Sequence, residues 1–160
     1  MAPGNTSAAG NLPAPRPADP SDLPGIEEVI GRAYARYAGL LDRPPAPVLH
    51  DYRPEIDAGC VWVLGEPIAG LIVLIERDDG LLIENVAVDP AEQGRGLGRV
   101  LLEFAEREAA ARGLPRLTLY TNEVMTDSLA VYLRLGYHEV DRRYEDGYRR
   151  IFLAKPISAG

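Results

Sequence analysis

The sequence predicts a single α/β domain built on a mixed, mostly antiparallel sheet of about six or seven strands, with helices on both faces. Apolar β-rich runs follow one another at residues 60–64, 68–76 and 81–88, and turn signals join them, as in antiparallel strands. A glycine-rich turn, a helical pattern and another apolar run at 116–121 come next. A strand reached through a helix is parallel to the strand before it. A last helix and a closing hairpin complete the pattern.

Size and charge narrow the class of protein. The chain has 160 residues, 46% of them hydrophobic, which suits one folded domain. Its net charge of −7 argues against nucleic acid as a partner, since surfaces that bind nucleic acid are basic. No apolar run approaches the roughly 20 residues that span a bilayer, and no signal-peptide pattern is present. Cys60 is the only cysteine, in keeping with a reducing compartment, and we expect a packed or partly exposed thiol rather than a nucleophile. We therefore expect a cytoplasmic protein without membrane or nucleic-acid partners.

The N-terminal third predicts a leader and two helices. Residues 1–18 are rich in Pro and Ala. We expect a flexible leader there that ends in a short or degraded first strand, because alternating prolines remove strand donors. The folded domain is expected at 19–156. Asp19 and the proline after it favour a helix start, and apolar spacings of three and four carry this helix to about Leu40. A run of prolines ends it, and a second, shorter helix is expected at about 48–58.

Turn chemistry and alternation define the central strands. The segment 65–67 and Asp79-Gly80 are hairpin signals. Trp62, in the first of these strands, is expected in the core. The alternation of apolar and polar residues breaks at 84–86, which predicts a β-bulge that frees a backbone N–H.

The C-terminal third predicts two helices and a hairpin. The helix after the glycine-rich turn is expected to end at Arg112, before a glycine. A last helix is expected to start near residue 126 with Asp127 as its cap, and to end before Gly136. Strands at 137–144 and 149–154 are expected to close the sheet.

The glycine-rich turn at residues 86–99 predicts an anion site. The first N–H groups of a helix are unpaired and the helix dipole is positive there, so this end binds phosphate. Gly94, Gly96 and Gly98 allow a ligand to approach the backbone closely, and two arginines add charge. A P-loop is excluded because Arg and Val follow Gly98 in place of Lys and Ser or Thr. A dinucleotide fingerprint fits poorly because the glycines alternate. The expected ligand is a small, phosphorylated molecule.

This segment resembles motif A of the GCN5-related N-acetyltransferase (GNAT) superfamily, Gln/Arg-x-x-Gly-x-Gly/Ala. Gln93, Gly96 and Gly98 occupy the motif positions, and Val88-Asp89-Pro90 matches the end of the family's fourth strand. The resemblance implies a GNAT fold, in which this strand and its parallel neighbour splay apart around an acyl-coenzyme. The backbone of the strand would pair with the pantetheine arm, and the turn would hold the pyrophosphate. The residues implied in binding acetyl-coenzyme A through this motif are Val86, Ala87, Val88, Gln93, Gly94, Arg95, Gly96, Leu97, Gly98 and Arg99.

Residues 128–137 resemble motif B of the same family, a helix that carries a tyrosine and, four residues on, a glycine followed by an aromatic residue. The resemblance places Tyr132 near the coenzyme sulfur. A phenol there can hydrogen-bond or protonate the leaving thiolate, so Tyr132 is assigned as general acid. Ser128 and Arg134 are implied as further coenzyme contacts. The chain departs from many relatives at Met125 and Ser128, where those relatives carry asparagine.

The acceptor side of the predicted site is less well defined. An amine must lose a proton before it attacks, and Glu84 is the only acid in 81–88, so it is assigned as the base, with partial burial raising its pKa. Tyr120 and Asn122 end the parallel neighbour strand and are expected to contact the acceptor. Either Val86 or Val88 can donate the N–H that polarises the thioester. The resemblance implies that the region of the first two helices forms one wall of the acceptor site. The candidates for substrate contact in this region are Tyr34, Tyr37, His50, Asp51 and Tyr52. Each of these alone is more typical of core or surface, so none is assigned.

These observations predict an N-acetyltransferase that moves an acetyl group from acetyl-coenzyme A to a primary amine by direct attack. The acceptor is an unidentified small molecule or peptide, and neither a metal nor a covalent enzyme intermediate is needed. The alternative is a non-catalytic acyl-coenzyme-binding sensor or interaction module. A homodimer is a further expectation, because dimers are common in the family.

Overall fold

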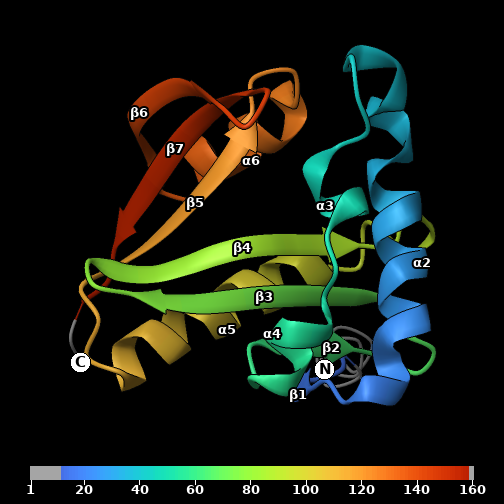
Figure 1. Ribbon diagram of the computed structural model, residues 1–160. Coiled ribbons are helices and arrows are strands. Elements are labelled where there is room, and N and C mark those ends of the chain that lie inside the picture. The colour runs from blue at the N-terminus through green and yellow to red at the C-terminus, as the bar shows by residue number, and fades with distance from the viewer. Residues whose placement is uncertain (1–11, 159–160) are drawn as a thin grey trace, which may run out of the picture.

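The computed structural model describes residues 12–158. Its centre is a seven-stranded sheet in the order β1-β2-β3-β4-β5-β7-β6 (Figure 1). Neighbouring strands pair antiparallel except β4 and β5, which are parallel. The mixed, mostly antiparallel sheet expected from the sequence is confirmed. The strands are β1 (Arg16–Pro17), β2 (Val61–Leu64), β3 (Gly70–Arg77), β4 (Gly80–Val88), β5 (Arg116–Asn122), β6 (His138–Glu145) and β7 (Tyr148–Pro156).

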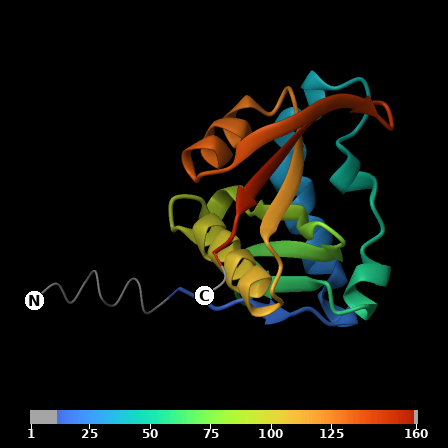
Figure 2. The same ribbon diagram turned by 90° about the vertical axis from the view of Figure 1, so that its left-hand side faces the viewer.

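Helices cover both faces of the sheet. Figure 2 shows α5 and α2 on opposite sides of the strands. The expected first helix is present as a 3-10 turn, an α-helix and a second 3-10 segment that ends at Leu40. The helical segments are η1 (Pro20–Asp22), α2 (Leu23–Tyr34), η2 (Ala35–Leu40), α3 (Ala46–Leu49), α4 (Arg53–Asp57), η3 (Pro90–Glu92), α5 (Leu97–Ala111) and α6 (Thr126–Arg134).

Strand β3 shows how the two faces are filled. Leu71 and Val73 belong to the apolar cluster of α2, whereas Ile72 and Leu74 belong to the cluster of α5. All four side chains are at most 1% exposed. A strand that is buried on both faces reads as a continuous apolar run. Removing one large aliphatic side chain from such a core costs about 2–5 kcal/mol.

The first strand is short, as expected. Arg16 pairs with Val63 of β2, and its guanidinium binds Asp22 through two hydrogen bonds of 2.9 Å. The part of the expected leader before residue 12 lies outside the described residues. Trp62 lies at the edge of the core, where its ring is 5.3 Å from that of Phe104 in α5.

The helix expected at about 48–58 is wrong. The chain forms two short helices there, α3 and α4, and His50, Asp51 and Tyr52 lie between them. Pro54 causes the break, because it has no N–H with which to continue a helix from His50. Proline is favoured in the first turn of a helix, which is where Pro54 lies in α4.

The expected cap of the last helix is also wrong. The N-cap position of α6 is Met125, whose side chain makes no capping hydrogen bond. Asn122 sets the start instead: its side chain accepts from the Val124 N–H at 3.1 Å, and its carbonyl accepts from the Met125 N–H at 2.9 Å. Asp127 lies in the first turn, with a carboxylate oxygen 3.6 Å from a guanidinium nitrogen of Arg36.

The bulge expected in the third strand of the series is confirmed. Val73 pairs with Asn85, but the next residue of β3, Leu74, pairs with Ile83, so Glu84 is an extra residue in β4. The extra residue reverses the alternation of faces. Ile83 packs in the cluster of α5, whereas Ala87 packs in the cluster of α2. Asn85 is thereby directed to the α2 side.

Strands β4 and β5 separate beyond the bulge (Figure 1). Their parallel pairing runs from Leu81 with Leu117 to Ile83 with Leu119 and then stops, although both strands continue. The splayed pair implied by the family resemblance is therefore present. Its opening lies at the carboxyl ends of the two parallel strands, where such sheets bind ligands.

Candidate active site

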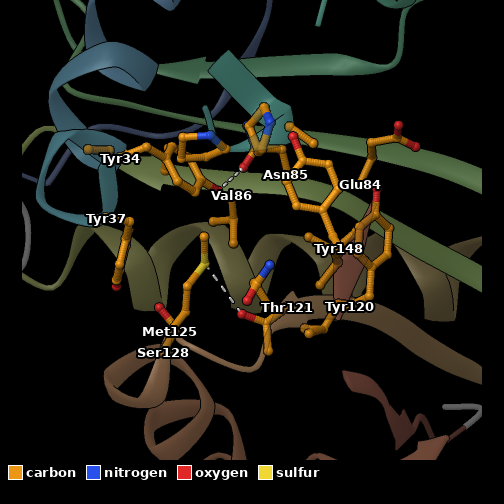
Figure 3. A pocket seen from close by; sticks show the side chains of 18 of the residues that line it. Tyr34, Tyr37, Glu84, Asn85, Val86, Tyr120, Thr121, Met125, Ser128 and Tyr148 are labelled. Carbon is orange, nitrogen blue, oxygen red and sulfur yellow. Dashed lines mark hydrogen bonds between the residues drawn. The ribbon is translucent and has the colours of Figure 1, made fainter. Parts of the chain in front are cut away.

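A cavity of about 420 Å³ occupies the opening between β4 and β5 (Figure 3). Its walls come from both sides of the sheet, because the strands no longer close the sheet there. Glu84, Tyr120 and Tyr148 gather on one side of the view in Figure 3, and Met125 and Ser128 lie on the other.

In the part of the chain that the structure describes, backbone groups of β4 have no strand partner at this opening. The Asp89 N–H donates to the Ala69 carbonyl on the β3 side at 2.8 Å. In an antiparallel ladder, alternate residues point their N–H and C=O groups to the same neighbour. The peptide groups of Val86 and Val88 therefore point away from β3, toward the strand from which β4 has separated. They can pair with an extended ligand.

The glycine-rich turn follows directly at the N-terminus of α5. Gly94 and Gly96 have positive φ angles of +89° and +82°. Apart from each glycine and its two chain neighbours, no atom of residues 12–158 lies within 4 Å of where a Cβ would be. The first intrahelical bond runs from the Val100 N–H to the Gly96 carbonyl at 3.0 Å, so the preceding N–H groups remain available. The Leu97 side chain is buried in the core, so only its backbone can serve a ligand.

The structure brings most of the expected site residues together. Those that line the cavity are Glu84, Val86, Ala87, Val88, Gln93, Tyr120, Asn122, Ser128 and Tyr132. Gly94 to Arg99 lie outside its lining, next along the chain from Gln93. Arg134 is exposed near the end of α6 and does not line the cavity.

Tyr132 reaches the cavity from α6. Its ring meets that of Tyr137 edge-on at 5.6 Å. Burial, with a smaller effect from Tyr37, raises the pKa of Tyr132 to about 12. The phenol is therefore protonated at neutral pH and can donate a hydrogen bond or a proton.

Glu84 is held at the bulge. Its side chain is partly buried, lines the cavity and has no ion-pair partner among residues 12–158. A carboxylate in this position is free to accept a proton from a ligand.

A hydrogen-bond chain that sequence reasoning missed fixes the helical wall to β4. Tyr34 donates to the Asn85 Oδ1 at 2.7 Å, the Asn85 Nδ2 donates to the Tyr52 hydroxyl at 3.1 Å, and Tyr52 donates to the Pro47 carbonyl at 2.8 Å. Burial raises the pKa of both tyrosines, so both hydroxyls keep their protons. An asparagine inside an apolar strand was the signal that could have revealed this chain of bonds.

Arg150 is a second cavity residue that sequence reasoning missed. Arg150 lies on β7, where it pairs with Asn122 of β5, and the residue as a whole is 9% exposed. Its guanidinium carbon is 4.4 Å from the centre of the Tyr120 ring. The pattern Tyr148-Arg149-Arg150 gives no sign of which arginine is buried, because this depends on the side chains of the neighbouring strand β5, such as Tyr120.

Residues 12–158 contain no group of three or more His, Cys, Asp or Glu side chains that could hold a metal ion. None of their helices has both the length and the apolar character needed to cross a bilayer.

The family comparison agrees with the fold and the cavity. The model of the Acetyltransferase (GNAT) family matches residues 27–137, so this chain belongs to that family. A mycothiol acetyltransferase of Nocardioides sp. is 42% identical over 65 residues, which are 41% of this chain and 22% of that protein. The chain thus spans about a fifth of the length of that relative. The [ribosomal protein bS18]-alanine N-acetyltransferase of Escherichia coli is 37% identical over 100 residues, 59% of this chain and 67% of the relative.

Solved structures show the same fold. The crystal structure of the ribosomal-protein-S18-alanine N-acetyltransferase from Escherichia coli superposes with a TM-score of 0.71 at 25% identity, covering 91% of this chain and 94% of that one. The PaiA N-acetyltransferase from Thermoplasma acidophilum, in complex with coenzyme A, gives 0.73 at 17% identity over 90% and 98% of the two chains. At that identity the second likeness concerns the fold alone.

Proposed function

We propose that this protein is an N-acetyltransferase that moves the acetyl group of acetyl-coenzyme A directly to a primary amine of a small molecule or peptide. The observation that carries the proposal is the opening between β4 and β5, where the peptide groups of Val86 and Val88 lack sheet partners beside the N-terminus of α5. A pantetheine arm pairs there as a strand would. A pyrophosphate fits the amide groups of Gly94 to Arg99, with the helix dipole in its favour.

Three groups supply the chemistry. Glu84 takes a proton from the ammonium group, directly or through water, and the freed nitrogen attacks the thioester carbon. The N–H of Val86 or Val88 hydrogen-bonds the carbonyl oxygen as it gains charge. The C–N bond forms and the C–S bond breaks, and the departing thiolate receives a hydrogen bond or a proton from Tyr132. The nitrogen loses its second proton as the amide forms, and this proton replaces the one that Tyr132 gave or passes to water. The transfer then needs no covalent bond to the protein.

Other residues would hold the coenzyme or complete the acceptor wall. Gln93 and Ser128 line the cavity on the coenzyme side, and Tyr120 and Asn122 line it from β5. Arg134 keeps its proposed contact with the ribose phosphate from outside the cavity.

The acceptor is left at the level of a primary amine. The relatives are named for mycothiol and for an alanine of a ribosomal protein, which differ in chemistry. A cytoplasmic location, a homodimer, and the lack of nucleic-acid and membrane partners remain predictions from the sequence.

Ligand-dependent thermal unfolding tests the coenzyme site. Acetyl-coenzyme A or coenzyme A at a hundredfold excess over its dissociation constant should add about 2.7 kcal/mol of stability, and NAD should add none. Gly96→Asp places a carboxylate in the phosphate turn and should abolish the gain. Gly113→Asp is the matched control, because Gly113 also has a positive φ, of +68°, and open space around it. Equal ligand shifts in both variants would refute the site.

Thiol release with a panel of amines tests the reaction. Tyr132→Phe and Glu84→Gln should each lower kcat by roughly 10²- to 10⁴-fold while coenzyme binding persists. Unchanged rates would refute the roles given to these side chains. Coenzyme binding without transfer to any amine would favour the non-catalytic acyl-coenzyme-binding module instead.

A further inference from the structure

Arg150 is a buried cation at the acceptor side of the cavity. Its side chain is 10% exposed, and its guanidinium lies against the ring of Tyr120 and within 5.7 Å of the centre of the Tyr148 ring. Burying a cation is costly unless it is paired and hydrogen-bonded. Any of its five N–H donors that lack a partner within the protein therefore indicate which kind of ligand Arg150 can bind.

Among residues 12–158, acceptors are present for only one nitrogen of this guanidinium. Nη1 donates to the Glu145 carboxylate at 2.7 Å and lies 3.5 Å from that of Asp146. Neither Nε nor Nη2 has an acceptor among residues 12–158. Nε and Nη2 form one edge of the guanidinium group, and an arginine can bind both oxygens of a carboxylate through such an edge. Among the described residues, the Tyr137 hydroxyl is the only fully buried side-chain polar atom without a hydrogen-bond partner. The unpaired Nε and Nη2 of Arg150 are therefore not fully buried, and they are open to the cavity that Arg150 lines.

The carboxylates near Arg150 are shared with other cations and with water. Glu145 also accepts from Arg143 at 3.2 Å, and the Asp146 side chain is 77% exposed. Arg43 reaches the same turn, where its Nη1 lies 3.4 Å from the Asp146 carbonyl. The Arg150 charge is therefore only partly neutralised by the turn, and a further anion is favourable at its free edge.

We propose that Arg150 binds a carboxylate of the acceptor, so that the acceptor is an amine that also carries a carboxylate, as an amino acid does. The inference rests on the proposed function and specifies its substrate class. The amine lies toward Glu84 and the carboxylate toward Arg150, with Tyr120 between them. Burial raises the pKa of Tyr120, and Arg150 lowers it while Glu84 raises it, which fits two opposite charges near one hydroxyl. Polyamines and other purely cationic amines are disfavoured, because Arg150 repels them.

Matched acceptors test this inference on the wild-type protein. Phenylalanine, phenylalaninamide and phenethylamine share one amine and one side chain but differ in the carboxylate, and alanine and lysine provide similar series. We expect a KM at least about tenfold lower for each amino acid than for its amide and its decarboxylated amine, the scale of one charge-assisted hydrogen bond. Equal KM values across each series would overturn the inference while the transfer reaction stands. No thiol release with any member of the series, while another amine of the panel does release thiol, would overturn the inference alone. No release with any amine of the panel would overturn the proposed function and the inference with it.

Variants assign the effect to this side chain. Arg150→Gln should raise the KM for amino acids about tenfold or more, change kcat little, and leave the decarboxylated amines unaffected or improved. Arg150→Lys, which keeps the charge but loses the two-pronged edge, should fall between the two. Arg149→Gln is the matched control, because Arg149 is the next residue in the chain and its side chain is 71% exposed. A carboxylate preference that survives in Arg150→Gln, with its folding verified by circular dichroism, would overturn the assignment.

Discussion

The hydrogen bond between Tyr34 and Asn85 ties α2 to the bulged strand, and its removal has a calculable cost. Tyr34→Phe deletes the hydroxyl that donates to the Asn85 Oδ1 at 2.7 Å. Asn85 is 5% exposed, so water does not readily replace that donor. The net loss of a hydrogen bond is about 1 kcal/mol, and a buried acceptor left unpaired adds about 1–2 kcal/mol. We therefore expect the free energy of unfolding to fall by about 2–3 kcal/mol.

A double-mutant cycle separates this bond from other effects. Urea unfolding of the wild type, Tyr34→Phe, Asn85→Ala and the double variant should give a coupling energy of about 1 kcal/mol or more. Tyr144→Phe is the matched control: that tyrosine is 70% exposed, and its change should stay within about 0.5 kcal/mol. Additive effects of Tyr34→Phe and Asn85→Ala would refute the bond as a stabilising link. A loss in Tyr144→Phe as large as in Tyr34→Phe would refute the assignment to burial.

Three further predictions concern glycines, acid stability and the general acid. Gly80→Ala should destabilise the protein by several kcal/mol in thermal unfolding, because a Cβ there would lie 2.6 Å from a carbonyl oxygen. Gly31→Ala, in α2 with open space around it, should instead stabilise the protein by about 0.5–1 kcal/mol. Similar effects of the two substitutions would contradict this prediction. The ion pair with Arg16 lowers the pKa of Asp22, so the stabilisation from this pair is present above the ordinary carboxylate pKa and is lost as the pH falls below it. The difference in the free energy of unfolding between wild type and Asp22→Asn should therefore be full at pH 7 and shrink below about pH 4. A difference that does not depend on pH would disprove this link. Because the pKa of Tyr132 is about 12 and its active form is protonated, kcat should show no decline centred near pH 10, and such a decline that disappears in Tyr132→Phe would be at odds with the burial.

Local pattern predicted most of the secondary structure, and its two errors have a common cause. Periodicity marks strands and helices where burial on one or both faces is regular, as in β3 and α2. The expected helix at 48–58 ignored the missing N–H of Pro54, and the expected cap at Asp127 ignored the turn that Asn122 forms just before the helix. In both places a local hydrogen-bond constraint overrode the apolar spacing.

Those parts of the candidate site that lie close together in the chain could be predicted from the sequence alone. The strand, the bulge at Glu84 and the glycine-rich turn follow from consecutive residues, because backbone conformation and helix-end charge are local properties. The opposite wall of the cavity, in contrast, depends on tertiary packing. Asn85 faces α2 because the bulge reverses the alternation of side chains between the two faces of the strand. Arg150 is buried because it lies against Tyr120 of a neighbouring strand. Burial and partnership are set by segments distant in sequence, and these decide which polar side chains face the cavity.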